Sequence, residues 1–74
     1  MVGALVKVVE TDKNPTVRIA AIRSLNRLGA PGLGALLTKV VQYDAPMVRT
    51  EAYQTLGWLG FPQGVVAMAN GLSD

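Results

Sequence analysis

Apolar residues along this 74-residue chain recur at spacings of three and four, as on one face of a helix, and do not alternate as in a strand. Pro and Gly fall between the apolar segments, where helices stop. The pattern predicts five short helices, over residues 2–11, 15–28, 33–43, 46–59 and 63–72. The chain is therefore expected to be all-α.

Each predicted helix has an apolar side that should face a neighbour. The inward positions are expected to be Val17, Ala21, Ser24, Leu25 and Leu28 in residues 15–28, and Val48, Ala52, Leu56 and Leu59 in residues 46–59. The helix at 2–11 is apolar on more than one side, because Ala4 and Val8 lie away from its other apolar residues. We expect a second copy of the chain, as a homodimer, or adjoining repeats to cover that end.

The turns carry residues typical of helix ends. Pro15 suits the first position of a helix, where its missing N–H costs nothing, and Asn14 before it is expected to be the N-cap. Gly29 should end that helix in a left-handed conformation.

The chain also repeats itself with a period of 31 residues. Asn14-Pro15-Thr16-Val17-Arg18 returns as Ala45-Pro46-Met47-Val48-Arg49, and 46 − 15 is 31. Such a period indicates a solenoid, in which each unit buries its apolar face against its neighbours. We predict one domain over 1–74, with a half repeat at 1–12 and repeats at 13–43 and 44–74.

The repeated motif is Asp, then Pro-x-Val-Arg, an Ala three residues on, and Leu-x-x-Leu-Gly. It stands here from Asp12 to Gly29 and again, one residue shorter in the turn, from Asp44 to Gly60. This motif resembles the HEAT-like repeats of the phycobilisome-lyase type. The resemblance implies a short α-solenoid, and family members include bilin lyase and isomerase subunits, phycobilisome-degradation factors and bacterial scaffold proteins.

The amino-acid composition excludes several classes of function. The chain has no Cys and no His, which excludes disulfides, a Cys/His zinc site, a thiol nucleophile and a histidine general base. Its few carboxylates lie mostly near turns or ends, where capping explains them. We therefore expect no enzyme activity, no cofactor and no metal, and the lack of Cys fits a cytoplasmic location. No apolar run is long enough to span a membrane.

Arg18 and Arg49 stand at the same place in the two repeats and invite two interpretations. Each guanidinium could pair with a turn carboxylate, Asp12 or Asp44, or with carbonyls at a helix end, which is the structural interpretation we favour. In the other, the arginines form a ladder that binds anions.

Three aromatic residues enter the second repeat. Trp58 replaces Arg27, Phe61 replaces Ala30 and Tyr53 replaces Ile22. Aromatic residues are enriched where interfaces concentrate their binding energy. Trp58 is thus either an exposed anchor for a protein partner or, with Phe61, a cap folded over the end of the chain.

A second candidate surface follows from the architecture. In HEAT-like arrays the second helix of each hairpin lines the concave side, and here those helices offer polar residues such as Lys39 and Gln42. The basic pair Arg23 and Arg27 fits a solvated helix face. A nucleic-acid partner is not expected, since no aromatic interleaving or groove-reading motif accompanies the pair.

We read the chain as a non-catalytic protein-binding adaptor, scaffold or assembly factor, and the resemblance suggests one associated with phycobilisomes. One alternative is a subunit of a bilin lyase or isomerase that needs a partner for activity; Arg18 or Arg49 would then hold the bilin propionates. The other is a self-associating fragment or designed repeat.

Overall fold

The computed structural model describes residues 1–61, and of Tyr43 only the backbone. Within that range the chain forms four helices and no strand, namely α1 (Val2–Thr11), α2 (Pro15–Arg27), α3 (Leu33–Tyr43) and α4 (Pro46–Trp58). The all-α prediction and the first four helices are confirmed. The predicted helix at 63–72 lies outside the described residues.

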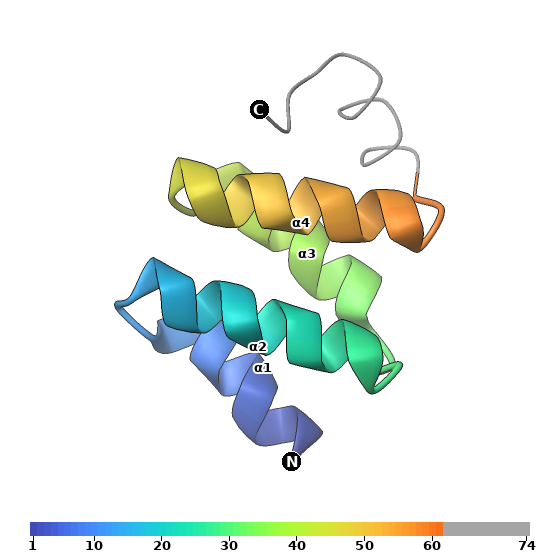
Figure 1. Cartoon of the computed structure of the whole chain (residues 1–74), viewed down its shortest axis with the longest axis horizontal. Helices are drawn as coiled ribbons and strands as arrows, with labels where there is room; N and C mark the ends of the chain where they lie inside the picture. The colour runs from blue at the N-terminus through green and yellow to red at the C-terminus, as the bar shows by residue number, and fades with distance from the viewer. Residues whose placement is uncertain (62–74) are drawn as a thin grey trace.

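The helices form two layers. In Figure 1, α2 and α4 run side by side in one layer, and α1 and α3 lie behind them. We call α1 with α2 the first helix pair and α3 with α4 the second helix pair, because the helices of each pair pack against one another. The two pairs stack through contacts of α2 with α4. This stacking is the arrangement expected of a short α-solenoid.

The helix starts follow from their turn residues. The Asn14 side chain accepts a hydrogen bond from the Thr16 N–H at 2.9 Å, so Asn14 is the predicted N-cap of α2, with Pro15 in the first turn. At the start of α4, where Ala45 has no capping side chain, Asp44 Oδ1 accepts the Ala45 N–H at 2.8 Å. A side-chain oxygen near each N-terminus thus takes a backbone donor that would otherwise lack a partner.

The ends of α2 and α4 are the same structure repeated. Gly29 and Gly60 have φ values of 65° and 83°, and the N–H groups of Ala30 and Phe61 bond the carbonyls of Leu25 and Leu56 five residues back. This is the Schellman arrangement, which needs a residue with positive φ and satisfies free carbonyls. Both helices therefore end one residue earlier than predicted, at Arg27 and Trp58.

The core lies where the four helices meet. It consists of Val9, Ala21, Ile22, Leu25, Leu33, Leu36, Leu37, Val40, Val48, Ala52 and Leu56. Three inward predictions are wrong. Leu28 and Leu59 are about half exposed because the chain turns away at the caps, and Val17 is 40% exposed because no helix of residues 1–61 stacks on that side of α2.

Candidate functional site

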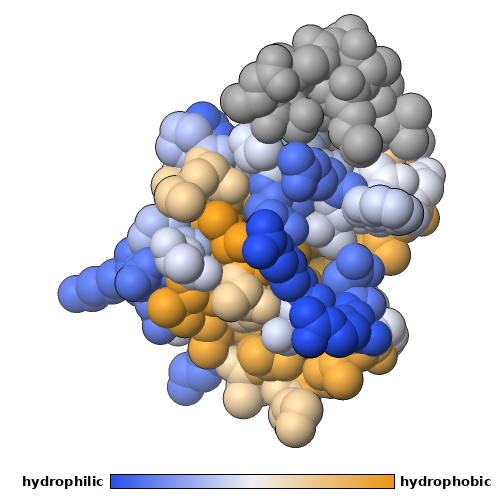
Figure 2. Space-filling model, in the orientation of Figure 1, coloured by the Kyte–Doolittle hydropathy of each residue, from blue (hydrophilic) through white to orange (hydrophobic). Residues whose placement is uncertain are grey.

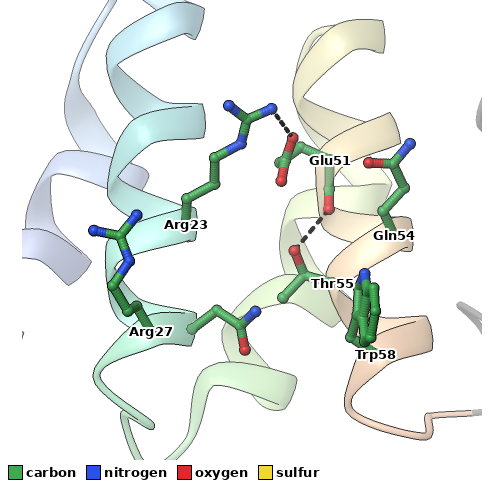
Figure 3. A pocket seen from close by; sticks show the side chains of 7 residues that line it. Arg23, Arg27, Glu51, Gln54, Thr55 and Trp58 are labelled. Atoms are coloured by element: carbon green, nitrogen blue, oxygen red, sulfur yellow. Dashed lines mark hydrogen bonds and ion pairs between the residues drawn. The ribbon is translucent and has the colours of Figure 1, made fainter.

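A groove runs between α2 and α4 on the outer layer. Its volume is about 380 Å³, and we name it the α2/α4 groove after its lining residues, Arg23, Asn26, Arg27, Glu51, Gln54, Thr55 and Trp58. Figure 3 shows the arginines on the α2 side and Gln54 and Trp58 on the α4 side. In the space-filling view, hydrophilic side chains cross the middle of this face and hydrophobic ones gather at its lower edge (Figure 2). The groove is therefore mostly polar, with an aromatic residue at one end.

One end of the groove is held by a hydrogen-bonded pair from the two stacked helices. Arg23 Nη2 donates to Glu51 Oε1 at 3.0 Å, and the Thr55 hydroxyl below donates to the Glu51 carbonyl at 2.9 Å. The hydrogen bond to Glu51, and then the charge of Glu51, raise the pKa of Arg23. The positive charge of Arg23 is therefore matched by Glu51 inside the groove.

Trp58 dominates the other end. It is the last residue of α4 and is 82% exposed. Its counterpart in α2 is Arg27, also exposed, so the same helical position presents a guanidinium in one repeat and an indole in the next. A Trp side chain is large enough that such exposure leaves much apolar surface in water. Among the described residues this makes Trp58 the strongest candidate for a partner contact.

Arg18 joins the two helix pairs. Its Nη2 pairs with Asp44 Oδ1 in the turn before α4, and its Nη1 donates to the carbonyl of Asp12. The side chains of Arg18 and Asp44 are only 13% and 6% exposed. Arg49, at the equivalent place, forms no ion pair within residues 1–61, so the two arginines do not make the same contact there. The Arg18 contact is structural and holds the stack.

The other predicted binding residues lie apart from the groove. Lys39 and Gln42 are exposed on α3, in the layer behind, and Tyr53 is half-buried on α4. Phe61 lies against α3, where a Cβ added to Gly34 would be 2.2 Å from its Cζ atom. Of the two aromatic residues weighed as a cap, Phe61 thus packs on the chain itself, whereas Trp58 faces solvent.

No group of three or more His, Cys, Asp or Glu residues within 1–61 could hold a metal ion. None of the helices within that range is long and apolar enough to cross a membrane.

The repeat motif, the stacked helix pairs and the glycine caps all point to one family. Residues 2–74 match the family model of HEAT repeats. This chain belongs to the HEAT repeat family. Comparisons with curated proteins and with solved structures found no match. HEAT repeats commonly act as scaffolds for protein–protein interaction, so the family supports a binding role at a general level.

Sequence reasoning found Trp58 but missed the groove of this HEAT repeat protein. It treated Arg23 as solvated and gave Glu51 no partner. Arg23 and Glu51 are separated by 28 residues, and nothing in their local sequence distinguishes them from other charged surface residues. Their contact depends on how α2 stacks on α4.

Proposed function

We propose that this chain is a non-catalytic protein-binding adaptor or scaffold, and that its partner docks in the α2/α4 groove against Trp58. The observation that carries the proposal is the 82% exposure of Trp58 beside a groove held by the Arg23–Glu51 hydrogen bond. Trp and Arg are the residues on which interfaces most often concentrate binding energy. The absence of His and Cys argues against the commonest forms of acid–base and thiol catalysis.

The test is a capture experiment with two matched variants. The chain is immobilised and exposed to the soluble extract of its native organism, and the same is done with Trp58→Ala and with Lys39→Ala. Trp58→Ala should lose the partner that the unaltered chain captures, and Lys39→Ala, on the other layer, should keep it. The reverse result would place the partner on the α3 side and contradict the groove. Circular dichroism should show both variants folded, because both side chains are exposed.

We also propose which kind of protein the partner is. The repeat motif suggests a phycobilisome protein in the cytoplasm, and phycobiliproteins or visible pigment in the captured fraction would support that choice. A colourless partner would be consistent with an adaptor and would contradict the association with phycobilisomes. The alternative, a bilin lyase subunit that needs a partner, would have to shift and sharpen bilin absorption when that partner is added.

We further propose that a second copy of the chain covers the open side of the first helix pair. Leu28 is 52% exposed there and Met1 90%, and they line a pocket of about 280 Å³ together with Leu5, Ser24 and Arg27, so Arg27 stands between this pocket and the α2/α4 groove. In the second helix pair the corresponding side is covered by α2. Light scattering should show a mass that rises with concentration, and a single monomer mass at all concentrations down to low micromolar would contradict the dimer.

A further inference from the structure

We infer that the segment that docks in the α2/α4 groove is acidic, and that it places a carboxylate on Arg27 and an apolar side chain on Trp58. This inference rests on the proposed function, since it names the chemistry of the partner at the same groove. Four features of the described residues support it: the charge balance of the lining, the position of Arg27, the amides on the walls and the carboxylate of Glu51.

The charges that line the groove do not balance. Arg23 and Arg27 bring two positive charges and Glu51 one negative charge. Because Glu51 is already bonded to Arg23, the charge that remains is that of Arg27, which makes no hydrogen bond or ion pair within residues 1–61. The C-terminus of α2 carries about half a negative charge, which is less than the full charge of the guanidinium. The groove thus presents one unmatched cation in water.

Arg27 and Trp58 are placed to act on one ligand segment. They occupy equivalent positions of α2 and α4 and both line the groove, and in Figure 3 the Arg27 guanidinium is turned to the side of α2 that faces away from α4, where it also lines a pocket with Met1 and Leu5. The planar guanidinium can take both oxygens of a carboxylate, and the indole can cover an apolar side chain. A segment that crosses the groove and continues over α2 would therefore meet an aromatic surface on α4 and a cation on α2.

The walls between them suit a peptide backbone. Asn26 on α2 and Gln54 on α4 both line the groove, and each side-chain amide has donors and an acceptor. A peptide presents both N–H and C=O groups, so such amides can bond it in either sense. Amides on both walls are thus compatible with an extended segment as well as with the exposed end of a helix.

The same groove is poorly suited to a nucleic acid, although an indole and a guanidinium could take a base and a phosphate. A nucleic-acid strand carries a charge on every nucleotide, and its affinity grows with the number of phosphates that basic residues neutralise. Here Glu51 stands in the wall and Arg27 is the one unmatched arginine of the lining. One carboxylate among apolar residues fits this charge better than a polyanion.

The experiment uses the whole chain and labelled synthetic peptides. One short peptide alternates Glu with Leu, and its control has Gln in place of each Glu; binding is followed by fluorescence anisotropy. The Glu peptide should bind about twofold to fivefold more tightly than the Gln peptide at low salt. The preference should shrink toward unity near 1 M salt, where the Debye length is about 3 Å. The chain's single Trp gives a second signal, because its emission should change on binding.

Three variants test whether the preference for the Glu peptide comes from Arg27. Arg27→Gln should remove the preference for Glu, whereas Lys13→Gln, which removes the same charge from the exposed turn between α1 and α2, should keep it. Trp58→Ala should weaken both peptides. Equal binding of the two peptides, or a preference for Glu that remains in Arg27→Gln, would contradict the inference that the docked segment places a carboxylate on Arg27.

The outcomes separate this inference from the function on which it rests. If both peptides bind equally and both are lost with Trp58→Ala, the groove remains a binding site and the acidic chemistry is wrong. If the peptides bind and Trp58→Ala does not change their affinity, the binding site is not the α2/α4 groove, and both proposals are contradicted. If neither peptide binds, or if a single-stranded oligonucleotide binds more tightly than the Glu peptide, the acidic-peptide inference is overturned. The capture experiment then still tests whether the chain is a protein-binding adaptor.

Discussion

The first and second helix pairs carry the same motif but bury it differently. Val17 and Val48 are the same residue at the same place in α2 and α4, yet Val17 is 40% exposed and Val48 is fully buried. The difference arises because α2 covers one side of α4, whereas no helix of residues 1–61 covers the matching side of α2. In a stacked repeat, burial is thus decided by which neighbour is present as much as by the residue itself.

Equivalent arginines and glycines of the two helix pairs also differ in their surroundings. Arg18 reaches the turn of the next pair and binds Asp44, while Arg49 forms no ion pair within the described residues. A Cβ on Gly3 of α1 would meet nothing within 4 Å, but one on Gly34 of α3 would collide with Phe61. Each pair of equivalent residues therefore gives a matched experiment, in which the same substitution should have two different effects.

The largest difference is expected between Arg18→Met and Arg49→Met. Removal of Arg18 leaves Asp44 nearly buried without its partner, which costs about 3–5 kcal/mol, a large share of the stability of a small domain. Arg49→Met should cost less than about 1 kcal/mol. The free energy of unfolding is measured by urea denaturation followed by circular dichroism. Equal losses in the two variants would contradict the structural role of the Arg18–Asp44 pair.

A middle-sized difference is expected between Val48→Ala and Val17→Ala. Val48 is fully buried under α2, so loss of its methyl groups should reduce the free energy of unfolding by about 2 kcal/mol. Val17→Ala should change it by less than about 0.5 kcal/mol. The same urea titrations measure both. If Val17→Ala proves as costly as Val48→Ala, something covers the first helix pair in solution, and the protein-concentration dependence of the loss would show whether it is a second copy.

The smallest difference is expected between Gly34→Ala and Gly3→Ala. Alanine favours a helix over glycine by up to about 1 kcal/mol, so Gly3→Ala should stabilise the chain by that amount or less. At Gly34 the new methyl pushes the Phe61 ring off α3, and we expect a net loss of about 1 kcal/mol. Thermal unfolding at a fixed scan rate compares the two.

A double variant checks the cause of the Gly34 effect. With Phe61→Ala in place, Gly34→Ala no longer meets the ring and should become neutral or stabilising, which a double-mutant cycle would show as a coupling between the two positions. An unchanged loss in that background would mean that the ring is not responsible.

Much of the fold could be predicted because local signals agreed with one another. The apolar period, Asn14-Pro15 at a helix start and Gly29 at a helix end each indicate the same boundaries, and the repeat confirms them with a second copy. The wrong inward predictions were Val17, on a side of α2 that no helix of residues 1–61 covers, and Leu28 and Leu59, which lie at caps where the backbone turns away. Periodicity assigns a side to a residue but does not show whether a neighbour covers that side.

The candidate site was harder to predict, since it depends on two repeats at once. Trp58 stood out because it breaks the repeat, replacing an arginine. Arg23 and Glu51 look like ordinary surface residues, and only the stacking of α2 on α4 brings them to 3.0 Å. Likewise, the carboxylate that pairs with Arg18 is Asp44 of the following turn, while Asp12 of its own turn contributes its carbonyl.

The amino-acid sequence by itself determined the helices, their caps and the repeat, because these depend on contacts within a few residues and on a period that the chain displays twice. The tertiary structure decided which valine is buried, which arginine is paired and where a groove forms, because each of these depends on the surface that a neighbouring helix pair presents. The α2/α4 groove belongs to the second group, since it is made by the junction of two repeats, each of which contributes one wall.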